Sequence, residues 1–306
     1  MPAIPFHVIV GAGATALATA RLLAEDGERV RLVSRRGSGP EHELIESIAL
    51  DATDAEALAE LCRDAATVFN CAMPAYDTWP QAIPPLFRAI LTAAERSGAD
   101  YVMLGNLYGY GPVDGPVTED LPLLATGPKG RVRAQMWQEA AQAHASGRVR
   151  ATEVRSGQFL GVGAMSSFTL TVQANVLAGQ LALTPAALDT PTGYTSIDDA
   201  ARALVTLARD ERSFGSAWHA PATNATVLEL ATILADLAGS PTPQLETMTD
   251  RDIALLSLTS PIWAEFAETA HMSHQPFLTD SSLVERVFGL KATPLDQVLG
   301  WLVAAE

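Results

Sequence analysis

The sequence predicts an α/β fold in which a doubly wound parallel sheet is joined to a smaller C-terminal α/β domain. The first half alternates short apolar runs with longer stretches of helical periodicity, which is typical of a parallel sheet covered on both faces. After Arg155 the alternation ends, and short strands are mixed with helices. The 306 residues are enough for two domains with sizeable cores.

Residues that usually begin or end helices bound the elements of the first half. Asp54 is a suitable N-cap, and Gly27 and Gly98 stand where helices are expected to end. The expected strands are His7–Val10, Arg29–Ser34, Glu46–Leu50, Thr67–Cys71, Asp100–Leu104 and Arg150–Val154. The expected helices are Thr15–Glu25, Asp54–Cys62, Gln81–Ser97 and Gly130–Ala145.

The second half is expected to form the smaller domain. Gly157–Gly163 is expected to be a loop, Phe168–Gly179 a helix, and Ile197–Arg209 a helix that returns to the main sheet. Further strands are expected around Ala217–Ala220 and Gln244–Met248, and helices near Val227–Ala238, Asp250–Leu256, Ser281–Val287 and Pro294–Val303. The first domain is therefore expected to span residues 1–160, with 194–212 returning to it. The second is expected to span 161–193 and 213–306.

Composition excludes several classes of function. Asp and Glu outnumber Lys and Arg by 35 to 20, a net charge of −15, which argues against nucleic acid or an anionic membrane as the main partner. Cys62 and Cys71 lack the spacing of a zinc or disulfide site, and Met1–Phe6 lacks the basic start of a signal peptide. We therefore expect a cytoplasmic protein. The six histidines, His271 and His274 included, show no ligand spacing, so no metal is expected.

A glycine-rich turn follows the first expected strand. Gly11 permits a tight turn, Gly13 lets the backbone approach a pyrophosphate, and Ala16 takes the third small position. The amides at the start of the following helix, at Ala14 and Thr15, would bind the anion. The sequence therefore predicts a Rossmann-type domain that binds a dinucleotide.

The end of the second strand indicates which dinucleotide is bound. An NAD site usually has an acidic residue there for the ribose, but this chain has Ser34, Arg35 and Arg36. A guanidinium pairs with a 2′-phosphate, whereas a carboxylate repels it. We therefore expect NADP as the cofactor. The alternative is that both arginines are ordinary solvated residues.

Several segments in their order resemble the extended short-chain dehydrogenase/reductases, the NAD(P)-dependent epimerase/dehydratase family. The segments are Asp51-Ala52-Thr53-Asp54, Val68-Phe69-Asn70-Cys71-Ala72, Asn106–Pro112, Arg155–Gly161, Tyr194–Arg202, Thr279–Ser282 and Phe288–Leu290. The resemblance covers nearly the whole chain. It implies that Asp51 and Ala52 lie at the adenine. It also implies further cofactor contacts from Asn70, Cys71, Ala72, Gly105, Ser156, Gly157 and Phe159, and a homodimer that pairs the helices Gln81–Ser97 and Gly130–Ala145. Ala89, Leu91, Ala93 and Ala94 on the first helix would suit close packing between two copies, and the alternative is that they are buried within one chain.

The chain departs from that family at the catalytic residues. The tyrosine of the family's Tyr-x-x-x-Lys motif falls on Lys129, its lysine on Arg133, and its Ser or Thr on Leu104 or Gly105. Two cations one turn apart could hold an anionic substrate, or Arg133 could favour the neutral form of Lys129 for proton transfer. The alternative is a solvated basic start of a helix.

Two other polar residues are candidates for catalysis. Asn106 could donate a hydrogen bond to a carbonyl or simply close the turn after its strand, and Tyr108 carries a phenol. The loop Leu107–Gly130 is long enough to be functional, and Met73–Pro80 could line a substrate pocket.

Three functions remain open. The leading hypothesis is an NADP-dependent oxidoreductase that acts on a small organic carbonyl. The absent tyrosine and lysine favour instead an NADP-binding sensor without turnover. The architecture also suggests a sugar-nucleotide epimerase or dehydratase, although those reactions depend on the missing tyrosine.

Overall fold

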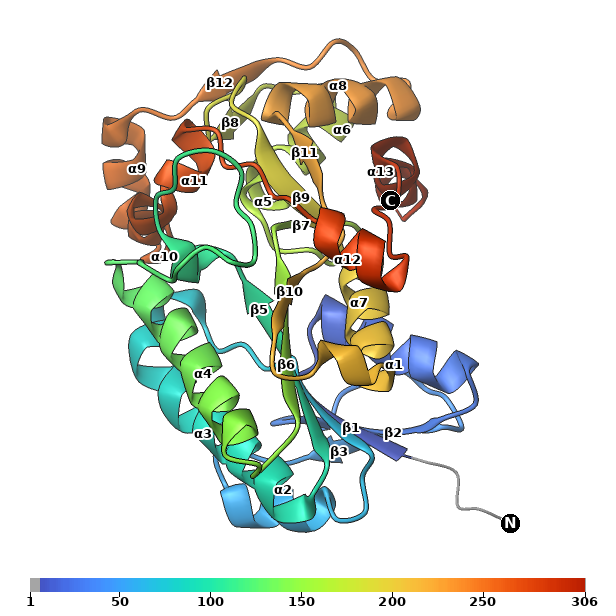
Figure 1. Ribbon diagram of the computed structural model, residues 1–306. Helices are drawn as coiled ribbons and strands as arrows, with labels where there is room; N and C mark the ends of the chain where they lie inside the picture. The colour runs from blue at the N-terminus through green and yellow to red at the C-terminus, as the bar shows by residue number, and fades with distance from the viewer. Residues whose placement is uncertain (1–5, 306) are drawn as a thin grey trace. The chain divides into compact units, whose positions relative to one another are not determined.

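The structure is a computed structural model that describes residues 6–305 (Figure 1). The chain divides into two compact units. The first holds the described residues up to Gly109, Pro128–Arg155 and Ala200–Trp218. The second holds Tyr110–Gly127, Ser156–Asp199 and the described residues from His219 onward. Residues 110–127 thus group with the second unit, whereas the bounds expected from the sequence place them in the first domain.

A seven-stranded sheet forms the centre of the first unit, in the order β10-β6-β5-β4-β1-β2-β3. Its strands are β1 (Phe6–Val10), β2 (Arg29–Ser34), β3 (Ile45–Ala49), β4 (Thr67–Asn70), β5 (Asp100–Asn106), β6 (Ala151–Ser156) and β10 (Ala217–His219). The neighbours from β3 to β5 pair in parallel. The direction of winding reverses between β1 and β4, and ligands bind at the carboxyl ends of strands beside such a switch point. The predicted doubly wound parallel sheet is confirmed.

Helices cover both faces of this sheet, α3 and α4 on one and α1 and α7 on the other (Figure 1). Their bounds are α1 (Ala14–Glu25), α2 (Ala55–Leu61), α3 (Trp79–Ser97), α4 (Pro128–Ala145) and α7 (Ile197–Arg209), with short 3₁₀ helices η1 (Tyr76–Thr78), η2 (Tyr108–Tyr110) and η3 (Glu211–Ser213). The predicted caps are confirmed. The Asp54 carboxylate accepts hydrogen bonds from two amides of α2, and Gly98 ends α3 with a φ of 73°.

The core of the first unit lies between the sheet and the helices α2, α3 and α4, and includes Ile83, Phe87, Tyr101 and Met103. Ala89, Ala93 and Ala94 of α3 are buried in the chain itself, and Leu91 packs against the same core. The residues suggested for pairing between two copies of the chain therefore serve the chain's own interior.

The second unit contains a three-stranded sheet in the order β11-β9-β7 and a two-stranded sheet of β12 and β8. Its strands are β7 (Gln158–Leu160), β8 (Ala182–Thr184), β9 (Thr192–Ser196), β11 (Thr223–Ala225) and β12 (Leu245–Thr247). Its helices are α5 (Ser167–Thr171), α6 (Gln173–Leu177), α8 (Val227–Ala238), α9 (Asp250–Ser257), α10 (Ile262–Glu265), η4 (Phe266–Thr269), α11 (His271–His274), α12 (Ser282–Phe288) and α13 (Leu295–Ala304). Its core gathers buried residues of α5, α6, α8 and α13.

Two expectations for this unit are wrong. The predicted loop Gly157–Gly163 contains β7, which pairs in parallel with β9, because a three-residue strand is fixed by a distant partner rather than by its own composition. The predicted helix Phe168–Gly179 is two helices, α5 and α6, broken at Val172, which has a φ of −110°. Val172 is β-branched, and β-branched residues have a slightly lower helix propensity, which favours a break at this position.

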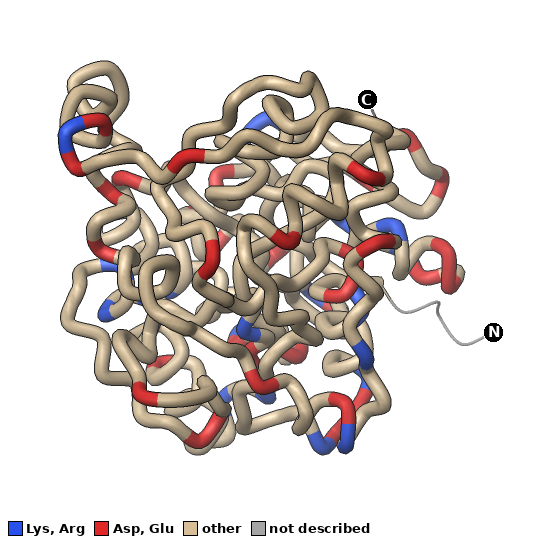
Figure 2. Tube along the Cα trace, turned by 90° about the horizontal axis from the view of Figure 1, so that it is seen from above, with Lys and Arg blue, Asp and Glu red and all other residues tan. Residues whose placement is uncertain are grey.

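Figure 2 shows acidic residues distributed along many segments of the trace rather than gathered in one stretch. In the described part of the chain, no helix has both the length and the apolar character that crossing a membrane requires.

Candidate functional site

The glycine turn between β1 and α1 has the geometry of a phosphate-binding loop. Gly11 has a φ of 121°, and a Cβ atom there would lie 2.6 Å from the carbonyl oxygen of Cys71, so only glycine fits. Gly13 is exposed immediately before α1, and a Cβ atom there would meet no atom within 4 Å. The backbone is therefore bare at the positive end of α1, as an anion site requires.

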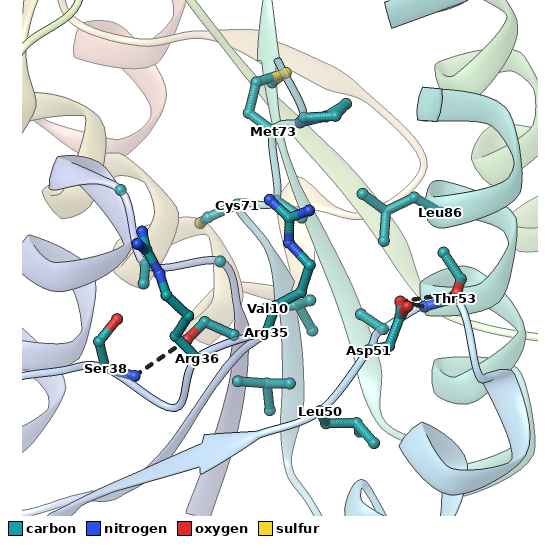
Figure 3. A pocket seen from close by; sticks show the side chains of 18 of the residues that line it. Val10, Arg35, Arg36, Ser38, Leu50, Asp51, Thr53, Cys71, Met73 and Leu86 are labelled. Carbon is teal, nitrogen blue, oxygen red and sulfur yellow. Dashed lines mark hydrogen bonds between the residues drawn. The ribbon is translucent and has the colours of Figure 1, made fainter. Parts of the chain in front are cut away.

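A second tight turn places two arginines at the end of β2. The Gly37 amide donates to the Ser34 carbonyl at 3.2 Å, so Arg35 and Arg36 occupy the middle of the turn. Gly37 has a φ of 61°, and a Cβ atom there would lie 2.9 Å from the Ala49 amide nitrogen. Both arginines are exposed and line a pocket with their side chains (Figure 3). Neither forms an ion pair with any residue between 6 and 305.

Asp51 stands at the end of β3 on the wall of the same pocket. Its Oδ1 atom accepts hydrogen bonds from the Thr53 amide at 3.0 Å and from the Thr53 hydroxyl at 2.8 Å (Figure 3). These two hydrogen bonds, with a further contribution from the charge of Arg35, lower the pKa of Asp51. The side chain is therefore a fixed acceptor at neutral pH.

The segment after β4 forms another wall. Asn70 is fully buried and donates from Nδ2 to the Tyr101 hydroxyl at 2.8 Å, while its Oδ1 accepts from the Ala72 amide at 3.3 Å. Asn70 thus shapes the backbone at Cys71 and Ala72, which line the pocket, and is not itself in the lining. Burial raises the pKa of the Cys71 thiol to about 12, so this wall is uncharged.

The resulting pocket has a volume of about 450 Å³. It brings together these residues expected from the sequence: Gly11, Gly13, Ser34, Arg35, Arg36, Asp51, Ala52, Cys71 and Ala72. Its lining does not include Ala14, Thr15, Ala16, Asn70 or Gly105. Met73 and Pro74, which were expected from the sequence to line a substrate pocket, also line this one. Sequence reasoning did not assign the other lining residues to a pocket: Val10, Ala12, Val33, Ser38, Leu50, Thr53, Ala82 and Leu86. Val10, Val33 and Leu50 lie at or next to the carboxyl ends of β1, β2 and β3. Ligands bind at these ends in such sheets, so the positions of these residues could have identified them as lining residues.

Lys129 and Arg133 share a buried face of α4, with 1% and 2% of their surfaces exposed. Arg133 donates from Nη2 to the Leu104 carbonyl at 2.6 Å. Its guanidinium carbon lies 5.3 Å from the ring centre of Phe87. Burial lowers the pKa of Arg133, against the charge of Glu153. The alternative of a solvated basic helix start is therefore wrong.

Lys129 lies beside an aromatic cluster formed by Tyr76, Trp79 and Tyr108. Its Nζ atom is 4.7 Å from the centre of the Tyr76 ring, and the Tyr76 hydroxyl donates to the Tyr108 hydroxyl at 3.2 Å. The Trp79 indole donates at 3.3 Å to the carbonyl of Pro74, a pocket residue. Asn106 accepts from the Tyr108 amide at 3.2 Å, so its Oδ1 closes the turn that carries Tyr108.

Sequence reasoning missed a buried ion pair within β6. Arg155 donates from Nε to Oε2 of Glu153 at 2.7 Å, and both residues are nearly fully buried. A Cβ atom at Gly105 would lie 2.2 Å from Oε1 of Glu153. Gly105 therefore makes room for this carboxylate. Glu153 and Arg155 are the two charged residues of a short strand whose other residues are apolar or small. Buried charged residues are usually paired, so this pattern could have indicated an ion pair.

The remaining expected cofactor residues, Ser156, Gly157 and Phe159, belong to the second unit. The Gly157 amide donates to the Thr195 hydroxyl at 3.1 Å. A Cβ atom at Gly157 would lie 2.3 Å from the Gly193 carbonyl oxygen. Gly157 is therefore required by the close approach of β9.

Comparison with solved structures shows the same fold in several enzymes. UDP-glucose 4-epimerase from Thermotoga maritima, solved with UDP-glucose, is 15% identical, with a TM-score of 0.78 over 98% of this chain and 97% of that chain. UDP-glucuronic acid 4-epimerase from Bacillus cereus, solved with UDP-glucuronic acid and NAD, is 15% identical, with a TM-score of 0.79 over 98% of each chain. dTDP-glucose 4,6-dehydratase from Bacillus anthracis, solved with NAD, is 14% identical, with a TM-score of 0.79 over 98% of this chain and 96% of that chain.

A comparison with curated proteins found no match. A family model described as the NAD dependent epimerase/dehydratase family matches residues 8–218. That range is more than half of the 306 residues, and it includes the glycine turn, the arginine turn and the buried face of α4. The chain therefore belongs to the NAD-dependent epimerase/dehydratase family.

Proposed function

We propose that this protein is an NADP-dependent enzyme that performs an oxidation or reduction step at a carbonyl or carbinol carbon of a small organic substrate. The observation that carries the proposal is the pocket in which the glycine turn faces the same cavity as two arginines that form no ion pair with the described residues. The bare backbone at Gly13 fits a pyrophosphate, and Arg35 and Arg36 fit a 2′-phosphate.

The residues around the pocket divide the binding task. Ser34, Arg35, Arg36 and Ser38 would hold the phosphorylated ribose, and the apolar side chains of Leu50 and Leu86 would pack against the adenine. Asp51 would accept a hydrogen bond from the adenine ring system. When bound, NADP supplies a carbon atom that donates or accepts a hydride.

Lys129 is the charged residue that would stabilise an oxyanion in this unit. Its burial strengthens the electrostatic effect of its charge, because a poorly solvated charge is weakly screened. Asn106 at the end of β5, Tyr108 in η2 and Arg133 on the next turn of α4 complete the candidate catalytic set. Gly105, Ser156, Gly157 and Phe159 remain candidates for contacts with the nicotinamide half.

The substrate class is part of the proposal. The three solved relatives are, by name, epimerases or a dehydratase of UDP- or dTDP-linked sugars, which favours a nucleotide sugar over a free carbonyl compound. Against it, Lys129 stands where the family has its tyrosine, and this favours a simple reduction or binding without turnover.

Binding and turnover assays test these readings together. Calorimetric titration should show tighter binding of NADP than of NAD, and equal affinities would contradict the proposal. NADPH oxidation with a panel of aldehydes and ketones tests the reductase. Chromatography of UDP- and dTDP-hexoses after incubation with the protein and cofactor tests epimerisation and dehydration. Tight NADP binding with no conversion of either panel of compounds would support the alternative of an NADP-binding sensor without turnover.

We further propose that the protein acts in the cytoplasm as a homodimer. The thiols of Cys62 and Cys71 are both free and buried, which suits a reducing compartment. The dimer rests on the resemblance to the family, with α3 and α4 as the paired helices.

A further inference from the structure

The chain carries a pair of phenols that its motif positions do not reveal. Tyr76 in η1 and Tyr108 in η2 lie 32 residues apart, and their hydroxyl oxygens are 3.2 Å apart. We propose that Tyr76 and Tyr108 form the proton donor and acceptor of this site, and that the ammonium group of Lys129 stabilises their phenolate form. This inference rests on the proposed function.

The cluster continues the wall of the dinucleotide pocket. Met73 and Pro74 line the pocket, and the Pro74 carbonyl accepts a hydrogen bond from the indole of Trp79, the first residue of α3. Trp79 lies 4.9 Å from Tyr76 and 5.8 Å from Tyr108 between ring centres. Both tyrosines are half-buried.

The charges around the pair favour a phenolate. Lys129 lies 4.7 Å from the Tyr76 ring centre, and a cation over a ring stabilises the negative charge that a phenolate delocalises into it. Arg133, the other charged residue of α4 that faces the pair, acts electrostatically on Tyr108. Asp77, next to Tyr76 in η1, is exposed to solvent and is therefore strongly screened.

The hydrogen bond sets the direction of proton transfer. Reduction of a carbonyl adds a hydride from the reduced dinucleotide at carbon and one proton at oxygen. Tyr108 gives that proton from its hydroxyl, and Tyr76 passes its own proton to Tyr108. The remaining negative charge then lies on Tyr76 beside Lys129, until water returns the proton. Oxidation of a carbinol runs the same transfers in reverse.

The first test is a spectrophotometric titration of tyrosinate in the protein without cofactor. The chain has five tyrosines. Burial raises the pKa of Tyr101 and Tyr194, and Tyr110 is fully buried with its hydroxyl bonded to His219. The first tyrosinate to form with rising pH should therefore belong to the pair, and it should be lost or shifted in Tyr76→Phe and in Tyr108→Phe.

Lys129→Met should move the midpoint of that first signal to higher pH, and Lys129→Arg should largely keep it. Lys291→Met is the matched control, since Lys291 is the other lysine of the chain, exposed and paired with Glu285. The proposal is overturned if Lys129→Met leaves the midpoint of the first tyrosinate signal unchanged. It is also overturned if that signal is the same in Tyr76→Phe and in Tyr108→Phe as in the wild-type protein. If Lys129→Met does not fold, the tyrosinate titrations of Tyr76→Phe and of the wild-type protein are compared instead. Tyr76→Phe keeps the aromatic ring and removes only the hydroxyl group.

Turnover gives the second readout. Tyr108→Phe should lower kcat about a hundredfold or more, which is the usual contribution of a positioned acid. Tyr76→Phe should lower it less, with NADP affinity unchanged in both. Tyr194→Phe, a buried phenol outside the cluster, should keep wild-type activity. Failure to bind NADP alongside a Lys129-dependent tyrosinate signal would refute the proposed function but support the pair. NADP binding and turnover with wild-type rates in Tyr76→Phe and Tyr108→Phe would refute the pair alone.

Discussion

Burial of charge is the main feature of the candidate site at the scale of residues. Lys129, Arg133, Glu153 and Arg155 are each at most 3% exposed, and Glu153 pairs with Arg155 and acts electrostatically on Arg133. In the described residues, the Nε and Nη1 atoms of Arg133 have no hydrogen-bond partner. A buried, incompletely paired charge is costly, and such costs are typical of functional sites.

The arginine turn gives a direct prediction about the cofactor. Replacing Arg35 and Arg36 together by alanine should remove the preference for NADP, because the 2′-phosphate loses its cationic partners. A charge-assisted contact is worth roughly 1.5–3 kcal/mol, or about one to two decades in affinity. Calorimetric titration measures the loss, and NAD affinity should stay the same. Arg29→Ala, at the other end of β2, is the control. A double variant that still prefers NADP would contradict the assignment.

The two cysteines predict a pH effect. Burial raises the pKa of Cys62 and of Cys71 to about 12, whereas an unfolded thiol ionises near pH 8.5. The folded state therefore keeps neutral thiols that the unfolded state loses. Their contribution to stability is fully present below about pH 8.5, and it is lost as pH rises towards 12.

We expect neither thiol to react with a disulfide reagent at pH 8 in the folded protein, and both to react after unfolding in denaturant. Single cysteine-to-alanine variants assign any signal that appears. Rapid reaction of Cys71 in the native protein would show that its wall of the pocket opens to solvent.

At the scale of elements, the connection from β1 to α1 separates two roles of glycine. Gly11 is needed for the backbone, since its φ is 121° and Cys71 leaves no room for a Cβ atom. We propose that Gly13 is needed for the ligand, since a Cβ atom there would meet nothing within 4 Å in the part of the chain that the structure describes. Two substitutions of the same kind should therefore have different effects.

Gly11→Ala should lower the free energy of unfolding by about 1–3 kcal/mol, from strain and contact. Gly13→Ala should leave unfolding nearly unchanged and weaken dinucleotide binding at least tenfold, because the added methyl occupies the pyrophosphate site. Denaturant unfolding and calorimetry on the same samples measure both effects. Equal stability of the two variants would refute this division of roles.

At the scale of the whole molecule, the surface of α3 and α4 bears on whether two copies of the chain form a dimer. With Ala89, Ala93 and Ala94 used in the chain's own core, a dimer through α3 and α4 must use their outer surface. There Arg88 and Glu139 link the two helices, with Nε to Oε2 at 2.8 Å. This surface is polar, so the area available for close apolar packing is limited.

The family resemblance still predicts a homodimer, which light scattering at micromolar concentration would show as twice the mass of 32.3 kDa. If the dimer uses this surface, Arg88→Glu should weaken it, because the substitution replaces an ion pair by repulsion from Glu139. Tyr194→Phe, buried in the second unit, is the control. A wild-type mass of one chain would rule the dimer out.

The parallel sheet, the glycine turn and the two arginines at the end of β2 could be predicted from the sequence, because each depends on local properties. Alternating apolar runs set the strands and helices, and Gly11, Gly27 and Gly98, which were expected at a turn and at two helix ends, each have a positive φ. Helix ends at Asp54 and Gly98 followed from capping, which is a matter of a few adjacent residues.

The pairings between distant residues could not be predicted from the sequence and became visible in the folded chain. Tyr76 meets Tyr108 because β4 and β5 are neighbours in the sheet. Glu153 fits beside Gly105 because β6 follows β5 in the strand order. The three-residue strand β7 exists only because β9 pairs with it. In each case the stabilising contact joins segments far apart in the chain, and neither segment's composition carries the information about its partner.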